Sequence, residues 1–381
     1  MAAQTQALQP AISNAINAVL QRGDFILGAD VANFEREFAD YCGVRDAVGT
    51  DSGLSALELA LRAARIGPGD EVITQANTFI ATVGAILAVG ATPVLVDCDA
   101  NGVIVPEQVA AAITPRTKAI MPVHLFGWIC DMDAINAIAK KAGVVVIEDA
   151  CQAHGAVWKG RRAGSFGISA AFSFYPAKNL GAYGDAGMLV TQSSEVADRV
   201  RTLRNYGSRA KYEHIDLPLN RRLDTLQAAV LRVKLPHLDT WNARRQFLAD
   251  AYREHLADLP VGLPPPAESG RHVYHLFVIT AEDRDALRAD LNEQGIETGI
   301  HYPIPVHRQP VMKATFPSPS AGGEDRSLFP QAEHLAAHSL SLPMYPELPL
   351  EHLERVADAI RRHYEGPHPN PPPRAGEGKA G

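Results

Sequence analysis

The sequence predicts an α/β protein, in which a large domain with a mostly parallel β-sheet between helices is followed by a smaller α+β domain. Two observations lead to this prediction. Short apolar segments alternate with amphipathic stretches from about residue 40 to residue 195, which is the rhythm of βαβ units. After about residue 222 the pattern changes to long stretches with apolar residues at helical spacing.

Six short apolar segments are predicted strands, and three amphipathic stretches between them are predicted helices. The strands are expected at 70–75, 93–98, 118–125, 144–149, 170–174 and 187–191, and the helices at 55–65, 78–89 and 132–142. Ligands of parallel sheets collect at the carboxyl ends of the strands. Asp97, His124, Asp149 and Ser173 fall at such ends, so a site is expected there.

The second half of the chain is predicted to begin with a long helix that Pro236 breaks or kinks. A strand at 272–280 and helices at 283–295 and 350–363 then suggest a small α+β domain. The tail has almost no apolar residues to bury. We therefore expect a large domain of residues 1–240, with an N-terminal helix that packs against the small domain, a small domain of residues 241–365, and a disordered tail of residues 366–381.

Composition and charge narrow the class of protein. Of the 381 residues, 46% are hydrophobic and 21% are charged, which is typical of a soluble globular protein. The formal net charge is -7 and the basic residues are scattered, so no nucleic-acid partner is expected. No signal peptide or continuous apolar span is evident, and we expect a cytoplasmic protein without a membrane partner. The four cysteines lie far apart without a CxxC pair, so neither a metal site nor a disulfide is expected.

Lys178 is the most informative single residue. It lies in the segment SFYPAKNLGAYGDAGML at 173–189, after a predicted strand and a proline, among small residues. Such a lysine can be a phosphate contact or a solvated charge. It can also form a Schiff base with an aldehyde cofactor, because a partly desolvated amine is the nucleophile that this chemistry requires.

Asp149 ends the predicted strand at 144–149. A carboxylate in this position can be a helix cap or a metal ligand. Together with Lys178 it suggests a third role, since a pyridine nitrogen stays protonated beside a carboxylate and the protonated ring then acts as an electron sink.

The segment VGTDSGLSALELALRA at 48–63 places a small polar loop before an amphipathic helix. Free N–H groups and the helix dipole make such a helix N-terminus an anion site, to which Ser52 or Ser55 can add a hydroxyl. Ordinary capping by Asp51, Ser52 or Ser55 explains the same residues.

These segments, in this order, resemble the DegT/DnrJ/EryC1/StrS family of sugar aminotransferases. The resemblance runs from FEREFADYCG at 34–43 to SLPMYP at 341–346 and includes GDEVITQANTFIAT at 69–82, TKAIMPVHLFG at 117–127, SFYPAKNLG at 173–181, LRNYG at 203–207, NRRLDTLQAAVLRVKL at 220–235 and HYPIPVH at 301–307. It implies the fold type I of pyridoxal-phosphate (PLP) dependent transferases, with a seven-stranded sheet in a large domain that binds the cofactor.

The resemblance also implies roles for individual residues. Lys178 would bond covalently to PLP and Asp149 would pair with its pyridinium nitrogen. Gln152 would approach the ring hydroxyl, and Phe79 would stack on the ring, although a phenylalanine at the start of a helix is more often a core residue. The phosphate would be held by Ser173, by Gly53, Leu54 and Ser55, and by Asn220 of a neighbouring subunit, which implies a homodimer with shared active sites.

Substrate contacts are expected from Tyr183, His301, Tyr302 and His307, because the matching family segments flank the mouth of the site. Each of them has a structural alternative. His124 and His154 are equally well explained by packing, and a nucleophilic or redox role for Cys151 is disfavoured because no paired base is evident.

The resemblance implies transfer of an amino group from an amino acid, glutamate in this family, to the keto group of a nucleotide-linked sugar. The family commonly has threonine where this chain has Leu54, and leucine there resembles members that act at carbon 3, so a dTDP-3-keto-6-deoxyhexose is favoured. Amination at carbon 4, a UDP or GDP carrier, and a non-catalytic PLP-binding regulator remain alternatives. A related sugar dehydratase is disfavoured, because those members have histidine in place of Lys178.

Overall fold

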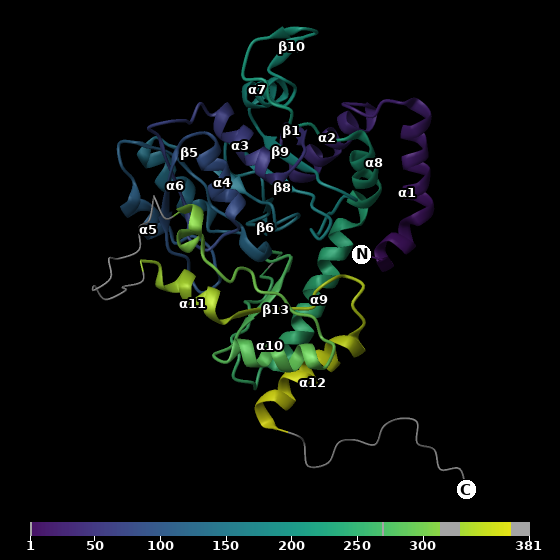
Figure 1. Ribbon diagram of the computed structural model, residues 1–381, viewed down its shortest axis with the longest axis vertical. Coiled ribbons are helices and arrows are strands. Elements are labelled where there is room, and N and C mark those ends of the chain that lie inside the picture. The colour runs from purple at the N-terminus through teal and green to yellow at the C-terminus, as the bar shows by residue number, and fades with distance from the viewer. Residues whose placement is uncertain (1, 269, 313–327, 367–381) are drawn as a thin grey trace.

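The computed structural model describes residues 2–268, 270–312 and 328–366. Of the predicted tail at 366–381, all residues but Gly366 lie outside these ranges. The molecule has two lobes (Figure 1). The upper lobe is built around a large sheet, and the lower lobe contains the last helix of the described chain. No helix within the described ranges is long and apolar enough to cross a membrane.

The seven-stranded sheet confirms the predicted α/β class. Its order is β1-β9-β8-β5-β4-β2-β3, and β9 is antiparallel to both of its neighbours while the other pairs are parallel. The strands are β1 (Asp46–Thr50), β2 (Glu71–Gln75), β3 (Thr92–Val96), β4 (Thr117–Ile120), β5 (Val145–Asp149), β8 (Ser169–Ser173) and β9 (Gly187–Thr191). Strand β1 was not predicted, because DAVGT is short and lacks the apolar run that marks the other strands.

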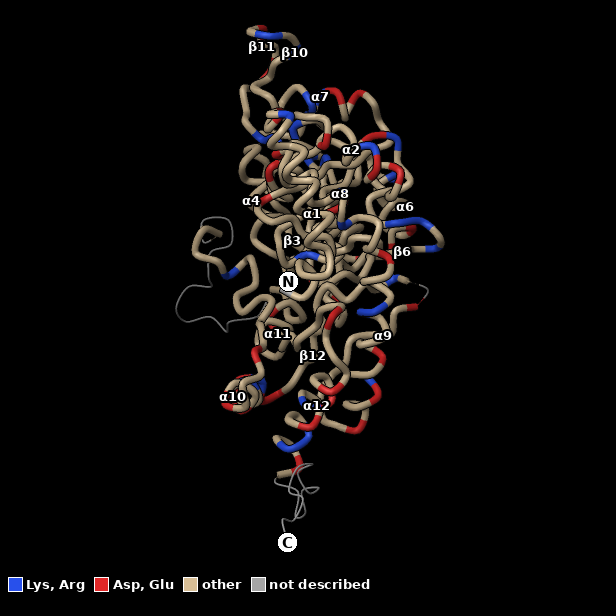
Figure 2. Tube along the Cα trace, turned by 90° about the vertical axis from the view of Figure 1, so that its right-hand side faces the viewer, with Lys and Arg blue, Asp and Glu red and all other residues tan. Residues whose placement is uncertain are grey.

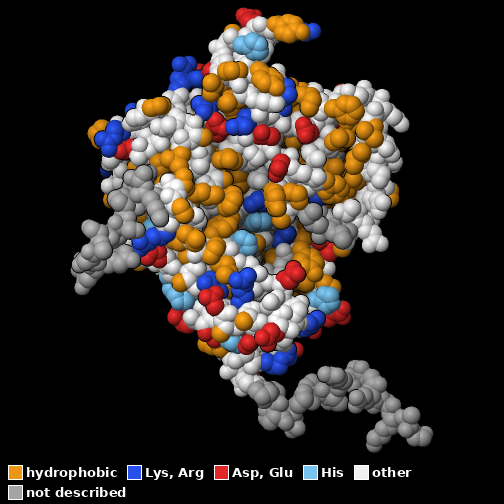
Figure 3. All heavy atoms as spheres, viewed as in Figure 1, with side chains coloured by type: hydrophobic (Ala, Val, Ile, Leu, Met, Phe, Trp, Pro, Cys, Tyr) orange, Lys and Arg blue, Asp and Glu red, His pale blue; other side chains and the backbone are white. Residues whose placement is uncertain are grey.

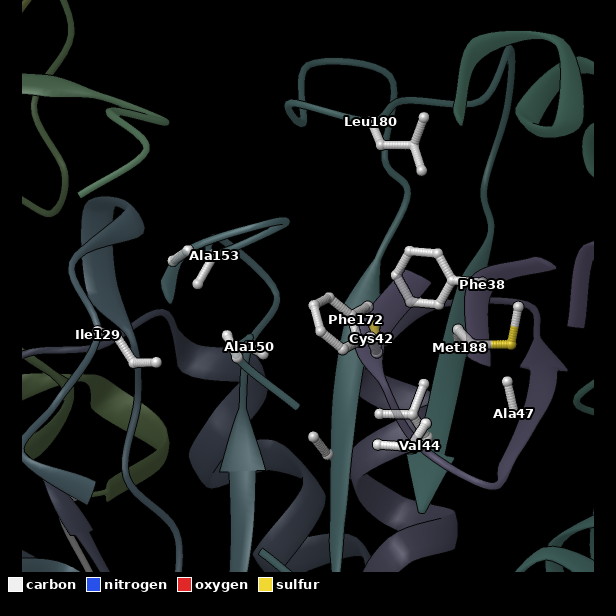
Figure 4. Close-up of a cluster of buried hydrophobic side chains, with 14 of the residues drawn as sticks. Phe38, Cys42, Val44, Ala47, Ile129, Ala150, Ala153, Phe172, Leu180 and Met188 are labelled. Carbon is white, nitrogen blue, oxygen red and sulfur yellow. The ribbon is translucent and has the colours of Figure 1, made fainter. Parts of the chain in front are cut away.

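Helices cover both faces of the sheet, and two hydrophobic clusters lie between the layers. The helices of this lobe are α2 (Ala29–Cys42), α3 (Gly53–Ala63), α4 (Ile80–Ala88), α5 (Pro106–Ala112), α6 (Met132–Ala142), α7 (Ser194–Arg204) and α8 (Thr225–Lys234). On one face, Phe38 of α2 meets Phe172 of β8 edge to face, with ring centroids 5.0 Å apart (Figure 4). Aromatic packing of this kind fixes α2 against the strand that precedes Lys178.

The remaining elements of the upper lobe lie at its periphery. A small hairpin, β6 (Val157–Trp158) with β7 (Arg161–Arg162), follows β5, and a second hairpin, β10 (Ser208–Ala210) with β11 (Glu213–His214), projects from the top of the molecule (Figure 1). The N-terminal helix α1 (Ala2–Arg22) runs beside α8. The side chain of Gln4, near the start of α1, donates to Glu347 over 3.4 Å.

Helix α9 (Leu238–Leu256) connects the two lobes. It is separated from α8 by a short 3-10 turn, Leu235–His237, which contains Pro236 and confirms the predicted break. The first residues of α9 belong to the upper lobe and its later residues join the hydrophobic cluster of the lower lobe, so the proposed boundary at residue 240 falls inside this helix.

The lower lobe packs α10 (Arg284–Glu293) and α12 (Leu350–Glu365) with a two-stranded sheet of β12 (Phe277–Thr280) and β13 (Ser339–Leu342). Helix α11 (Pro330–His338), which leads into β13, packs its apolar side chains against Ala76, Val83 and Leu95 of the upper lobe. The predicted strand at 272–280 was wrong in its first half. Tyr274 has a φ of 41°, and the Val273 N–H bonds to the Gly127 carbonyl over 3.0 Å, so this segment follows the upper lobe before it turns into β12.

Charged residues are spread along both lobes with the two signs interspersed (Figure 2). This agrees with the scattered charges of the sequence.

One carboxylate of the sheet lies fully in the interior, where hydrogen bonds from its neighbours surround it. Glu148 of β5 is 0% exposed and accepts hydrogen bonds from the N–H groups of Gly164, Phe166 and Gly167 at 2.7–2.8 Å. His124 completes the set: its Nδ1 accepts from the Cys130 N–H, so its Nε2 carries the proton and donates to Glu148 over 3.1 Å.

Glu148→Gln should therefore destabilise the protein by about 3 kcal/mol. The side-chain NH2 group of the glutamine would face backbone N–H groups or His124, which are hydrogen-bond donors themselves. Urea unfolding at one fixed protein concentration measures the loss. Glu293→Gln, on the exposed side of α10, is the matched control and should leave the unfolding midpoint unchanged. Equal midpoints for the two variants would contradict the role given to Glu148.

Candidate active site

A cavity of about 520 Å³ opens at the carboxyl edge of the parallel strands. Its floor comes from the residues that follow β1, β2, β5 and β8, and its rim from the segments around residues 275, 301 and 344. This is the edge at which ligands of such sheets bind. Of the residues predicted for the site, nine line the cavity: Gly53, Leu54, Phe79, Asp149, Gln152, Ser173, Lys178, His301 and Tyr302.

Lys178 lies on the turn that follows β8, where its N–H donates to the Tyr175 carbonyl over 2.8 Å. Burial lowers the pKa of Lys178 below the usual range of lysine, although Cys151 and Asp149 act in the opposite direction. A larger share of its amine is therefore uncharged at neutral pH than for an exposed lysine, and the uncharged amine is the nucleophilic form.

Asp149 is 4% exposed and its carboxylate is held in place from two sides. Its Oδ2 accepts from the Thr82 hydroxyl over 2.8 Å, and its Oδ1 accepts from the Cys151 N–H over 3.2 Å. Since Thr82 donates to Asp149, its oxygen accepts from the Thr78 hydroxyl at 2.7 Å. The hydroxyl groups of Thr78, just before α4, and of Thr82, within α4, thus hold the Asp149 carboxylate in place. This carboxylate faces the same cavity as Lys178.

The N-terminus of α3 forms the anion end of the cavity. Ser52 is the N-cap and accepts from the Ser55 N–H over 3.1 Å, which leaves the N–H groups of Gly53 and Leu54 without a partner in the described part of the chain. Ser55 is buried and its hydroxyl meets that of Ser52 at 3.1 Å. Of the two serines predicted to add a hydroxyl to the anion site, Ser52 lines the cavity and Ser55 does not.

Gly53 lies so close to Cys151 and Ser173 that there is no room for a side chain at this position. A Cβ at this position would lie 2.6 Å from the Cys151 Sγ and 2.8 Å from the Ser173 Cβ. The glycine therefore allows the backbone of α3 to approach β8 closely enough for Ser173 and the first N–H groups of the helix to share one anion.

Gln152, Tyr302 and Phe79 form the wall beside Asp149. The Gln152 Oε1 accepts from the Phe126 N–H over 2.7 Å, so its amide group is the donor to the Tyr302 hydroxyl, 3.1 Å away. Burial raises the pKa of Tyr302 to about 12. Phe79 is 50% exposed and its ring lies 5.3 Å from that of Tyr302. Phe79 is therefore a cavity wall rather than a core residue.

His301 lies on the rim, where its Nδ1 is 2.8 Å from the Ser341 hydroxyl. Burial and the nearby Lys178 lower the pKa of His301.

Besides Ser55, three predicted residues do not line the cavity of their own chain. The Tyr183 hydroxyl donates to Thr5 of α1 over 2.8 Å, and its ring lies beside Lys234. His307 is buried, 2.8 Å from Glu333, so it holds two segments of the chain together. Asn220 is exposed on the stretch that follows the β10–β11 hairpin.

The structure brings to the cavity several residues that were not predicted, among them Thr78, Thr82 and His275. Thr78, just before α4, and Thr82, within it, are four residues apart, and this helical spacing was the available signal. His275 gave no such signal, because it lies in the segment that was predicted as a regular strand.

The chain's own groups fit PLP. A buried, oriented carboxylate suits a protonated ring nitrogen, a lysine with a lowered pKa suits an aldehyde, and two free N–H groups beside a glycine suit a phosphate. The hydroxyl of Ser173 and the second N–H of the Gln152 amide add donors at the two ends of this arrangement.

Gly53→Ala should weaken PLP binding by at least roughly tenfold, since its methyl group would separate α3 from Ser173. Gly84→Ala is the matched control, because a Cβ there meets only Leu54 at an ordinary 3.7 Å. Titration of the apoenzyme, followed by cofactor absorbance, measures both. Equal affinity in the two variants would show that the close approach at Gly53 is not needed.

Comparison with known proteins supports this reading of the site. The model of the DegT/DnrJ/EryC1/StrS aminotransferase family matches residues 6–361. A dTDP-3-amino-3,4,6-trideoxy-alpha-D-glucose transaminase of Streptomyces venezuelae is 49% identical over 92% of this chain and 91% of its own length. A UDP-N-acetyl-3-dehydro-alpha-D-glucosamine 3-aminotransferase of Acidithiobacillus ferrooxidans is 47% identical, over 94% and 95%.

Among solved structures, S. venezuelae DesV in complex with a ketimine intermediate superposes with a TM-score of 0.90 at 48% identity, and the alignment covers 95% of this chain and 96% of that one. The similarity extends over nearly the whole of each chain and includes the sheet, α9 and the lower lobe. The chain therefore belongs to the DegT/DnrJ/EryC1/StrS aminotransferase family, whose members are PLP-dependent enzymes of fold type I.

Proposed function

We propose that this enzyme transfers an amino group from glutamate to the keto group of a nucleotide-linked sugar, with a dTDP-3-keto-6-deoxyhexose as the favoured acceptor. The observation that carries the proposal is the placement of Lys178 and the fixed carboxylate of Asp149 in one cavity. The names of the two similar transaminases support the sugar substrate.

The groups of this chain divide the chemistry among them. Bound PLP supplies an electron-withdrawing ring that stabilises negative charge on the carbon bearing the amino group. Asp149, oriented by Thr82, keeps a negative charge where the ring nitrogen must stay protonated. Lys178, once its amine is free, would take a proton from the amino-bearing carbon of the donor and deliver it to the C4' carbon of the cofactor. In the opposite half of the cycle it would move a proton from C4' to the sugar carbon. Burial lowers the pKa of Lys178, which suits this exchange because it makes the uncharged amine that accepts the proton easier to form.

Carbon 3 is favoured over carbon 4 as the amination site. Both similar transaminases named above act at carbon 3, on different nucleotide carriers. Leu54, 42% exposed at the cavity, is the residue of this chain that resembles carbon-3 members. The resemblance to enzymes of 6-deoxysugars favours dTDP over UDP as the nucleotide that carries the sugar.

We further propose a homodimer in the cytoplasm. Hydrophobic side chains gather over much of the upper lobe on one face (Figure 3). The exposed large apolar residues of that lobe include Phe25, Ile26, Tyr206, Ile215 and Leu217. A second copy would bury such a surface, and the exposed Asn220 on the same stretch of chain would then reach the partner's phosphate site.

With glutamate and a panel of 3-keto and 4-keto sugars on dTDP and UDP, wild-type enzyme should aminate the dTDP-linked 3-keto sugar fastest. Lys178→Ala should show no turnover and no cofactor label after borohydride reduction, because the amine that attacks the aldehyde is absent. Lys234→Ala removes a lysine outside the cavity and should keep the label. Turnover of none of the sugars by wild-type enzyme would refute the sugar assignment, and a label on Lys178→Ala would refute the lysine.

A mixing experiment tests the shared site. Lys178→Ala and Asn220→Ala subunits, each poorly active alone, should regain about a quarter of wild-type activity after mixed refolding, because half of the dimers are mixed and each has one intact site. Asn205→Ala in place of Asn220→Ala serves as a control that should be active before mixing. No recovery on mixing, or a fully active dilute monomer, would contradict the proposed role of Asn220.

A further inference from the structure

His275 is a cavity residue to which the mechanism above gives no role. It is 8% exposed, lines the cavity together with Lys178, and comes from the segment that leads into the lower lobe. Its backbone is held firmly: the Arg245 guanidinium of α9 donates to the carbonyls of Tyr274 and His275 at 2.9 and 3.4 Å. Both the position and the surroundings of the ring are therefore fixed before a substrate arrives.

A directional set of hydrogen bonds determines which ring nitrogen carries the proton. The Asn242 side chain donates to the His154 carbonyl over 2.8 Å, so its oxygen is the acceptor that faces Asn179. The Asn179 amide group donates to that oxygen over 2.9 Å and to the Val273 carbonyl over 3.0 Å. Both of its protons are thus used.

The oxygen of Asn179 must then accept, and the group that reaches it is the Nδ1 of His275, 3.2 Å away. Nδ1 therefore carries the proton and Nε2 does not. Burial and the positive charges of Lys178 and Arg245 hold the pKa of His275 well below its usual value, so the ring stays neutral. The other titratable groups that act on it are His154 and His301.

The Nε2 atom is left as a bare acceptor. It has no hydrogen-bond partner in the parts of the chain that the structure describes. It is also not fully enclosed, since some of its surface remains accessible. Because the ring lines the cavity, the accessible side of Nε2 belongs to the cavity. A neutral acceptor there attracts a hydroxyl or an amine and repels a carboxylate or phosphate oxygen.

We propose that His275, held by Asn179 as the Nδ1–H tautomer, accepts a hydrogen bond from a hydroxyl of the sugar through Nε2 and thereby contributes to the choice of sugar. The inference rests on the proposed sugar-aminotransferase function. The amino-acid donor does not fit this atom as well, since its carboxylates need hydrogen-bond donors. Asn179, next to Lys178 in the chain, is a positioning residue that acts through the ring.

The test compares two variants in the two half-reactions. His275→Asn keeps a donor near the Nδ1 position but has nothing at Nε2, whereas His275→Gln places an amide oxygen near Nε2. Each is mixed in its PLP form with L-glutamate or, in the reverse direction, with a dTDP-linked 3-amino-6-deoxysugar, and the loss of cofactor absorbance gives the rate and the apparent dissociation constant.

We expect His275→Asn to raise the apparent dissociation constant of the amino sugar about tenfold, the size of one lost hydrogen bond, and to change that of glutamate by less than about twofold. His275→Gln should restore most of the sugar affinity. His275→Ala gives the same comparison if the asparagine variant does not hold the cofactor.

Unchanged sugar affinity in both the asparagine and alanine variants would overturn the proposal, as would an equal loss in the two half-reactions. Failure of the proposed function looks different: wild-type enzyme would react with glutamate but with no nucleotide-linked amino sugar, and both proposals would then fall together.

Discussion

The parallel pairing of β5 with β8 is the interaction on which the site depends. Asp149 at the end of β5 is paired with Ala171 of β8, so Ser173 and the turn that carries Lys178 emerge beside it. Successive side chains of a strand point to opposite faces. Asp149 can therefore face the cavity while Glu148, the preceding residue, is buried on the other side, where four hydrogen bonds tie β5 to the loops that surround it.

Polar groups around the cavity are arranged so that each has one defined direction. Thr82 donates to Asp149, the Phe126 N–H donates to the oxygen of Gln152, and the oxygen of Asn179 accepts a hydrogen bond from His275. In each case the partner on the protein side decides which atom faces the cavity. Such groups need little reorganisation when a ligand binds.

The two lobes contribute different parts of the cavity. The upper lobe supplies the anion site, Asp149 and Lys178, which together match a cofactor. The C-terminal half supplies His275, His301, Tyr302 and Met344 at the rim. Helix α9 connects these parts physically, because its Arg245 donates to the carbonyls of Tyr274 and Met344 at 2.9 and 3.0 Å. Cofactor chemistry and substrate choice can therefore vary separately in this architecture.

The sequence by itself determined the features that local patterns encode. Short apolar strands with intervening helices identified the α/β class, and Lys178, Asp149 and the loop before α3 stood out because each lies at the end of a predicted element. Only the tertiary structure decided that Gly53 is pressed against Ser173, that Thr82 orients Asp149, and that Tyr183 and His307 face away from the cavity of their own chain. These arrangements depend on contacts between residues that are far apart in the chain, so the spacing of residues in a local segment cannot predict them.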